Sequence, residues 1–207
     1  MTPKKKKILI QTLAELYPDP RSELDFENEY QLLIAVMLSA QCTDKKVNQV
    51  TPELFKSYPT FKALSNAKLP DVEQIIRPIN YYKTKSKHLI ATAKEVVERF
   101  NSHVPETHKE LTSLPGVGNK TANVILSEKG VVPAFPVDTH IYRLARRLGL
   151  SSGETPDAVE KDLRQAFPSS EWRGLHHRLI FHGRRVCGAR SPQCSECTLR
   201  SICPSAT

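Results

Sequence analysis

The chain has 207 residues, which is enough for one large domain or for two small ones with cores of their own. Its 30 Lys and Arg residues against 22 Asp and Glu give a formal charge of +8, a balance that favours an anionic partner because bound phosphates release counterions. No apolar run reaches the length of a bilayer, and the lysine-rich N-terminus is followed by apolar residues at helical spacing. The sequence therefore predicts neither a membrane span nor a secretory signal.

The first half of the chain predicts helices. Leu9 and Leu13 recur at helical spacing near the N-terminus, and the run from Leu32 to Leu38 has the length of a buried helix. Helical spacing continues from Leu89 to Phe100, and strand-like alternation is scarce along the whole chain. We therefore expect an all-α protein of roughly ten helices joined by short loops.

The stretch from about Thr107 to Lys129 reads as a helix, a tight turn and a second helix. In the turn, Gly116 and Gly118 let the backbone bend sharply and approach a ligand. The N–H groups at the start of the second helix form an anion site suited to a phosphate. Lys120 stands at the positive end of that helix dipole, where an ammonium ion is disfavoured and a nucleophilic amine is favoured. Alternatively, Lys120 is a solvated helix residue or a simple phosphate contact.

A stiff loop, residues 130–136, follows this hairpin and contains two prolines and a glycine. It is the expected crossing between two domains. We expect a helical-bundle domain of residues 22–133 and a second domain built from residues 1–21 and 134–207. Residues on either side of the loop would then face each other across a cleft, where substrates usually bind.

The phrase Val137-Asp138-Thr139-His140 begins the next helix. Asp138 directly precedes the helical residues and is a good N-cap. A carboxylate held in this way can also stabilise positive charge on a sugar ring, or exchange a proton with Lys120. The two roles are compatible, and both stay open. Thr139 and His140 are candidates for phosphate contacts, and His140 alternatively for a structural hydrogen bond.

Four of the five cysteines follow one another closely, as Cys187-x6-Cys194-x2-Cys197-x5-Cys203. In a reducing cytosol, four clustered thiolates point to a metal site, and either zinc or a four-iron, four-sulfur cluster fits them. The segment from Glu171 to Arg200 also carries six arginines, Arg184 among them, against two glutamates. A metal-braced loop of this kind would present a rigid phosphate-binding surface, or would simply replace a small hydrophobic core.

Taken together, these features resemble the endonuclease III family. The turn Leu-Pro-Gly-Val-Gly is the helix-hairpin-helix phrase of non-sequence-specific DNA binders, and Leu38-Ser39-Ala40-Gln41, Val-Asp-Thr-His and the cysteine spacing extend the resemblance over nearly the whole chain. The resemblance implies a two-domain helix-hairpin-helix DNA glycosylase fold. It implies a bifunctional glycosylase and abasic-site lyase of base-excision repair, in which Lys120 attacks C1′ of the damaged nucleoside and Asp138 assists. It also implies that the four cysteines hold a 4Fe-4S iron-sulfur cluster.

An enzyme that acts at C1′ must take a nucleotide out of the base stack, and a side chain should fill the gap. Gln41 matches the family's position for such an inserted residue; without that match it reads as a solvated or capping glutamine. The family usually has a Gly-aliphatic/aromatic-Tyr phrase nearby, whereas this chain has Asn80-Tyr81-Tyr82. Tyr81 would then be the wedge that stacks on neighbouring bases, and opposite-base preference stays open. Cys42 is expected to be a small buried residue.

The resemblance implies that the partner is double-stranded DNA containing oxidised pyrimidines or abasic sites. The expected DNA contacts are Gln41, Tyr81, Gly116, Val117, Gly118, Thr139, His140 and Arg184. We expect a monomer, a bacterial-type protein of the cytoplasm and nucleoid. Two alternatives are a glycosylase for mismatched or alkylated bases on the same scaffold, and a non-catalytic helix-hairpin-helix DNA-binding protein with a structural metal. The basic charge and the hairpin disfavour an electron-transfer iron-sulfur protein.

Overall fold

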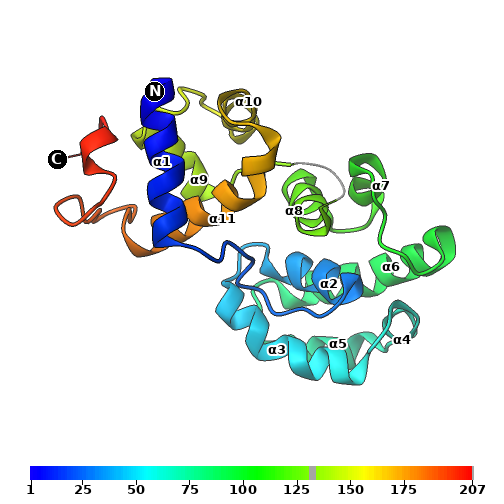
Figure 1. The fold of residues 1–207 in the computed structure, drawn as a ribbon. Helices are drawn as coiled ribbons and strands as arrows, with labels where there is room; N and C mark the ends of the chain where they lie inside the picture. Colours follow the sequence, from blue (N-terminus) through cyan, green and yellow to red (C-terminus); the bar gives the residue numbers. More distant parts are fainter. Residues whose placement is uncertain (131–133, 207) are drawn as a thin grey trace. The chain divides into compact units, whose positions relative to one another are not determined.

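The structure of the protein is a computed structural model that describes residues 1–130 and 134–206. Within these residues it contains eleven α-helices, one short 3-10 helix and no β-strand, which confirms the expected all-α class (Figure 1). The chain divides into two compact units, Ser22–Val132 on the one hand and Met1–Arg21 with Pro133–Thr207 on the other. Lys120 belongs to the first unit and Asp138 to the second.

The Ser22–Val132 unit is built from seven helices, one of which, α2, is buried. They are α2 (Glu29–Ser39), α3 (Asp44–Ser57), α4 (Phe61–Ser65), α5 (Leu69–Ile75), α6 (Tyr82–Phe100), α7 (His108–Ser113) and α8 (Asn119–Lys129). Eight of the eleven residues of α2 are buried, and α2 packs against α3, α6 and α8. The run from Leu32 to Leu38 has no polar face for that reason, and the expected buried helix is confirmed.

The buried ammonium group of Lys129, at the end of α8, forms an ion pair with Glu29 at the beginning of α2. The Lys129 ammonium lies 2.9 Å from the Glu29 carboxylate and 3.3 Å from that of Glu106, and it donates a hydrogen bond of 3.2 Å to the Val104 carbonyl. The Lys129 side chain is only 4 % exposed, so its partners are needed to offset the loss of hydration. This contact fixes α8, which carries Lys120 at its other end.

The second unit combines the two ends of the chain. Its helices are α1 (Pro3–Leu16), α9 (Thr139–Arg147), α10 (Pro156–Ala166), α11 (Ser169–Arg185) and the 3-10 helix η1 (Arg200–Ile202). α11 packs against α1 and α9, and α9 also packs against α10. Leu9 and Leu13 of α1 are fully buried in one core with Leu175 and Leu179 of α11. Each such leucine contributes roughly 1.5–3 kcal/mol, so α1 is an integral part of this unit.

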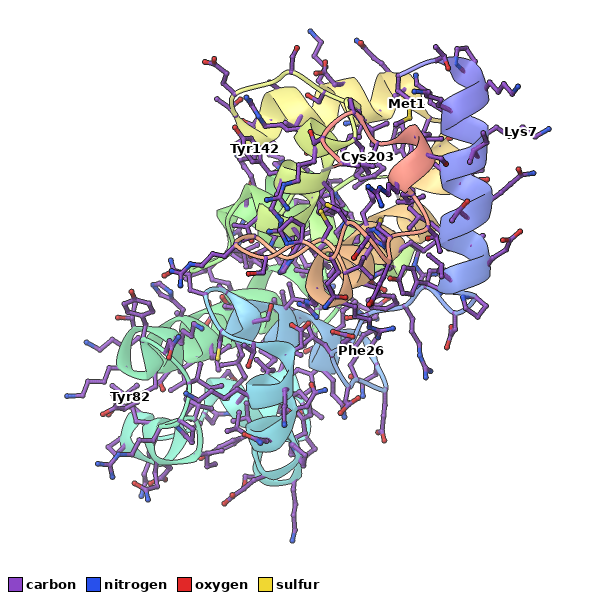
Figure 2. All side chains as sticks on the ribbon, turned by 90° about the vertical axis from the view of Figure 1, so that its left-hand side faces the viewer. Met1, Lys7, Phe26, Tyr82, Tyr142 and Cys203 are labelled. Carbon is purple, nitrogen blue, oxygen red and sulfur yellow. The ribbon has the colours of Figure 1, made fainter. Side chains whose placement is uncertain are left out.

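The expected crossing, residues 130–136, is described only in part. Residues 131–133 lie outside the described residues, whereas Phe135 is fully buried in the core that contains α9. Among the described residues, no helix is both long and apolar enough to cross a membrane. Lys4, Lys5 and Lys7 of α1 are exposed, and Figure 2 shows Lys7 projecting away from the helix.

Candidate active site and metal centre

The hairpin that carries Lys120 depends on a glycine. Gly116 has a φ of +77°, and a Cβ atom at this position would lie 2.6 Å from Nδ1 and 2.8 Å from Cβ of His88. No other residue fits there, because the space is taken and the backbone is left-handed. The Thr92 hydroxyl donates a hydrogen bond of 2.7 Å to the Pro115 carbonyl, so a side chain of α6 stabilises the turn.

The turn leads directly into α8, whose N-terminus has no capping side chain. Gly118 is the N-cap of α8 and provides no capping side chain, which leaves the first N–H groups of the helix for another acceptor. Val117 is only 5 % exposed and its N–H group donates to the Leu114 carbonyl at 3.1 Å. Its side chain therefore anchors the turn in the core. Lys120 is exposed, and the first turn of α8 contains no acidic residue.

In the other unit, the carboxylate of Asp138 has a defined direction. Asp138 is the N-cap of α9, and its Oδ1 accepts a hydrogen bond of 2.8 Å from the Ile141 N–H group. The expected capping role is therefore confirmed. Asp138 is half-buried, so one oxygen is used by the helix while the group as a whole still reaches solvent.

Two arginines, Arg143 and Arg184, lie close to His140 in the first turn of α9. The Arg143 guanidinium lies 3.2 Å from Nδ1 of His140 and donates to the carbonyls of Gly183, at 2.9 Å, and Cys187, at 3.0 Å. Burial lowers the pKa of His140; the Asp138 carboxylate opposes this, and the charges of Arg143 and Arg184 reinforce it. The imidazole is therefore neutral near pH 7, and it stands among groups that favour an anion.

Two of the expected DNA contacts in the Ser22–Val132 unit come together although forty residues separate them. Gln41 and Tyr81 are both exposed, and both have a left-handed backbone, with φ of 55° and 59°. Tyr81 is the most exposed of the large hydrophobic residues in the described part of the chain, at 67 %. The two loops are joined directly, since the Asn80 amide donates a hydrogen bond of 2.8 Å to the Gln41 carbonyl. Cys42 is partly buried against the core, where a small buried residue was expected.

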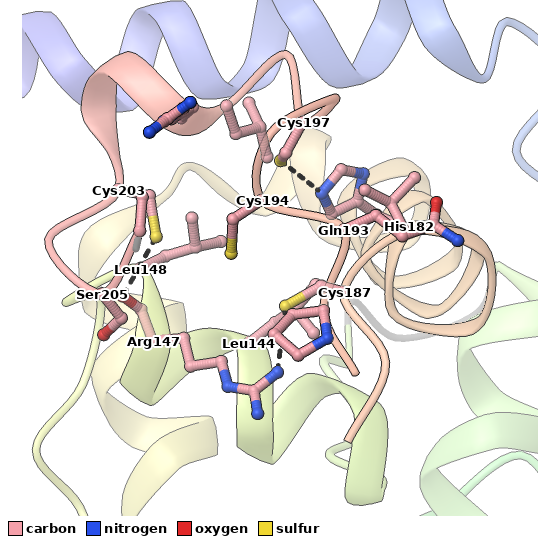
Figure 3. A pocket seen from close by; sticks show the side chains of 15 residues that line it. Leu144, Arg147, Leu148, His182, Cys187, Gln193, Cys194, Cys197, Cys203 and Ser205 are labelled. Atoms are coloured by element: carbon pink, nitrogen blue, oxygen red, sulfur yellow. Dashed lines mark hydrogen bonds between the residues drawn. The ribbon is translucent and has the colours of Figure 1, made fainter. Parts of the chain in front are cut away.

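The four C-terminal cysteines line one cavity. It has a volume of about 170 Å³, and Figure 3 shows the four sulfur atoms around it, together with Arg147 and His182. In the described residues, no group of three or more His, Cys, Asp or Glu side chains is arranged to hold a metal ion. The sulfur donors required for an iron-sulfur cluster nevertheless all border the same space.

Polar side chains lie beside two of these sulfur atoms. Nη1 of Arg147 donates to the Cys187 sulfur at 3.3 Å, and Nε2 of His182 lies 3.4 Å from the Cys197 sulfur (Figure 3). Burial raises the pKa of the Cys197 thiol, and the other three cysteines raise it further, whereas a main-chain hydrogen bond from Leu199 lowers it. Four thiolates in this space repel one another, so a bound cation or positively charged cluster core would stabilise them.

No motif in the sequence points to Arg143 or Arg147. Both lie on α9, and their only signal is that they follow His140 by three and seven residues, which places the three side chains on one helix face. Arg147 also donates to the carbonyls of Gly188, at 2.8 Å, and Ala189, at 2.9 Å. Together, these two arginines hold the loop that begins at Cys187.

The chain is similar to known proteins both in sequence and in architecture. Residues 34–169 match the family described as the HhH-GPD superfamily of base excision DNA repair proteins. Endonuclease III of Treponema pallidum is 47% identical over 90% of this chain and 88% of its own length. Endonuclease III of Escherichia coli is 38% identical over 98% of this chain and 96% of its own.

The chain is also similar to solved structures. A trapped endonuclease III–DNA covalent intermediate aligns with a TM-score of 0.93 and 41% identity, over 100% of this chain and 97% of its own. A thermostable thymine-DNA glycosylase aligns with a TM-score of 0.87, but at 21% identity it shows only that the fold is shared.

Proposed function

The chain belongs to the endonuclease III family of base excision DNA repair proteins, and from this membership we propose that Lys120 is its nucleophile and Asp138 the carboxylate that assists it. The protein is a DNA glycosylase with abasic-site lyase activity, and its partner is double-stranded DNA. The substrates are oxidised pyrimidines and the abasic sites that remain after their removal. The protein acts as a monomer in the bacterial cytoplasm, on the DNA of the nucleoid.

The Lys120 amine carries out the covalent chemistry. Its nitrogen bonds to C1′ as the glycosidic bond breaks, and the base leaves with a proton. Ring opening then gives an imine between Lys120 and C1′. The imine withdraws electrons, so C2′ loses a proton and the bond from C3′ to the phosphate oxygen breaks. The exposed position of Lys120 at the open start of α8 supports this role, because substrate can reach the amine there.

The Asp138 carboxylate stabilises the positive charge that develops on the sugar during base loss. Its hydrogen bond to Ile141 holds it in one orientation before the substrate arrives, which is the condition for electrostatic stabilisation of a transition state. It also accepts a proton from Lys120, which makes the amine nucleophilic.

Both units contribute to DNA binding. In the Ser22–Val132 unit, the backbone at Gly116 and Gly118 and the open start of α8 hold a phosphate. In the other unit, Thr139 and Arg184 are exposed and contact the backbone near the lesion, together with His140. Gln41 and Tyr81 enter the base stack and occupy the space of the extruded nucleotide.

A 4Fe-4S iron-sulfur cluster held by the four C-terminal cysteines completes the second unit. When bound, the cluster supplies no step of the reaction; it joins the Cys187–Cys203 loop into one rigid piece. The position of the four sulfur atoms around one cavity and the side chains of Arg147 and His182 beside them support this assignment. Residues Arg143 and Arg147 link that loop to α9, and so to Asp138.

Borohydride trapping tests the assignment of Lys120. The protein is incubated with a duplex that contains one abasic site, and borohydride reduces any imine to a stable amine, which appears as a protein–DNA adduct on a denaturing gel. Wild type is expected to give the adduct and Lys120→Gln none, while its affinity for the duplex stays within a few-fold. Lys161→Gln, at an exposed lysine of α10, serves as the control and should trap normally. Normal trapping by Lys120→Gln would show that another amine is the nucleophile.

A further inference from the structure

Gln41 and Tyr81 occupy strained positions in two separate loops of the Ser22–Val132 unit. Gln41 lies between α2 and α3, and Tyr81 lies immediately before α6; their φ angles are 55° and 59°. A left-handed backbone costs a non-glycine residue about 1–2 kcal/mol. Such a cost persists only where neighbouring contacts hold the residue in place, so the contacts around the two loops are informative.

Lys85 provides the first of these contacts. Its ammonium donates hydrogen bonds of 2.7 Å to the carbonyl of Leu38 and of 2.7 Å to that of Ala40, at the C-terminal end of α2. The residue is only 9 % exposed, and burial lowers the pKa of Lys85 while the Cys42 side chain acts in the opposite direction. A helix C-terminus has unpaired carbonyls and a negative dipole end, which is why a buried lysine is tolerated here without a carboxylate.

The same lysine also contacts the second loop. Its main-chain N–H donates a hydrogen bond of 3.0 Å to the Tyr81 carbonyl, which closes the first turn of α6. That turn begins at Tyr82, labelled in Figure 2. Lys85 therefore holds the residue before Gln41 with its side chain and Tyr81 with its main chain.

Asn80 provides the second contact. It is the neighbour of Tyr81, and its side-chain amide donates a hydrogen bond of 2.8 Å to the carbonyl of Gln41. The carbonyls of Ala40 and Gln41 are thus each bonded to a side chain from the segment around Tyr81. Asn80 stands where the family phrase is expected to have a glycine, and a glycine has no side chain that could make this bond.

We propose that Asn80 and Lys85 are positioning residues that hold Gln41 and Tyr81 as one rigid pair, so that both side chains enter the base stack in a single arrangement. The inference rests on the proposed function of Gln41 and Tyr81 as inserted residues. Preorganisation of this kind removes the entropy cost of ordering two loops at the moment of binding. It also explains why both loops keep a strained backbone.

If Asn80 and Lys85 position the pair, their loss should slow the reaction on double-stranded DNA only. A duplex with an abasic site requires insertion, whereas a single-stranded oligonucleotide with the same site does not. Trapping rates on the two substrates are therefore compared for Asn80→Ala and Lys85→Met. A variant with a generally weakened fold loses rate on both, so the ratio of the two rates separates positioning from stability.

For Asn80→Ala we expect a loss between about threefold and tenfold on the duplex and less than about twofold on the single strand. For Lys85→Met the duplex loss should be about tenfold or more, since two carbonyls lose their partner. Asn66→Ala is a matched control. The Asn66 amide also donates a hydrogen bond of 2.8 Å to a carbonyl, that of Lys62, but this bond lies at the end of α4 and does not involve Gln41 or Tyr81. Lys94→Met, at an exposed lysine of α6, controls for the lost charge.

A double-mutant cycle completes the test. If Asn80 acts through Gln41, then Asn80→Ala should cost less than about twofold in a Gln41→Ala background. Equal losses on duplex and single strand, or none, while Gln41→Ala and Tyr81→Ala slow the duplex reaction, would overturn the positioning role and leave the proposed insertion intact. If Gln41→Ala and Tyr81→Ala are themselves without effect, insertion by these residues fails and the inference fails with it. Asn80 is exposed, so its variant keeps the test valid even if Lys85→Met does not fold.

Discussion

The carboxylate of Asp138 accepts a hydrogen bond of 2.8 Å from the main-chain N–H of Ile141, which makes one group both the cap of α9 and the proposed partner of Lys120. The two roles need different properties of the side chain. Capping needs an acceptor oxygen, whereas stabilising a cationic sugar needs a negative charge. An amide retains the first property and lacks the second, so a single substitution separates them.

Asp138→Asn should therefore keep the fold and lose the reaction. We expect a free energy of unfolding within about 0.5 kcal/mol of wild type, and a single-turnover excision rate lower by roughly 10²- to 10³-fold. Asp138→Ala should be about 1 kcal/mol less stable in addition. Urea denaturation and excision from a duplex containing an oxidised pyrimidine measure both quantities. A catalytically normal Asp138→Asn would mean that the carboxylate is only a cap.

Gly116→Ala should destabilise the hairpin by about 2–4 kcal/mol. The new methyl group would meet His88 at 2.6 Å and 2.8 Å, and one of the atoms it meets is the His88 Cβ, which cannot move out of the way without its backbone. Gly118→Ala is the matched control, since apart from its chain neighbours no atom lies within 4 Å of a Cβ there. Its stability should stay within about 1 kcal/mol of wild type, the remaining loss arising because alanine is a poorer N-cap than glycine.

The same clash makes a rescue experiment possible. Adding His88→Gly, which removes the Cβ as well as the ring, to Gly116→Ala should recover the steric part of the loss and leave about 1–2 kcal/mol from the left-handed backbone, besides the roughly 1 kcal/mol that a glycine itself costs inside α6. Thermal unfolding of the four combinations measures the coupling. Strict additivity of the two substitutions would show that the His88 contact is not the cause.

Arg147→Met should release the proposed iron-sulfur cluster faster than wild type does. Arg147 donates to the Cys187 sulfur and to the carbonyls of Gly188 and Ala189, so its loss frees the start of the cysteine loop. We expect visible absorbance and protein-bound iron to decline several-fold faster in the presence of a chelator. Arg146→Met is the control, because the neighbouring Arg146 donates to Gly153 and stacks on Tyr142 instead. Equal rates of iron loss in the two variants would contradict the prediction.

His140 should contribute to acid sensitivity. Burial lowers the pKa of His140 from its ordinary value of 6.5, so below about that pH the unfolded chain binds a proton that the folded chain does not. Folding stability must therefore fall as the pH drops below 6.5, and His140→Gln should lose that part of the decline. The melting temperature at pH 7.5 and pH 5.5 tests this, with the exposed His103→Gln as the control. A wild-type pH dependence in His140→Gln would place the sensitivity elsewhere.

Features with a local cause could be predicted from the sequence. The apolar run from Leu32 to Leu38 predicts a buried helix, and Asp138 predicts a helix start, because each depends on residues within a few positions. The turn at Gly116 is similar, since a left-handed position in a tight turn favours glycine. These three predictions are confirmed.

Features that join distant segments could not be predicted. Asn80, Lys85, Arg143 and Arg147 all donate to main-chain carbonyls, and a carbonyl has no residue identity that a sequence pattern could reveal. Which carbonyl a side chain reaches depends on how the helices pack. Lys85 illustrates this, because in the sequence it belongs to the run of Lys83, Lys85 and Lys87, which reads either as a solvated helix start or as contacts to the DNA backbone, whereas Lys85 is buried in the structure.

The unit that holds the cysteines is assembled from both ends of the chain, and this has a consequence for synthesis on the ribosome. Arg178 donates to the Tyr17 carbonyl across a separation of 161 residues, and Leu9 and Leu13 of α1 are buried against α11. At translation rates of about 5–20 residues per second, α1 waits roughly 8–32 s for its partner. The Ser22–Val132 unit, by contrast, is contiguous and can fold during that interval. The nascent protein therefore has its DNA-binding hairpin before its cluster loop, and α1 is the segment that exposes apolar surface to chaperones in the meantime.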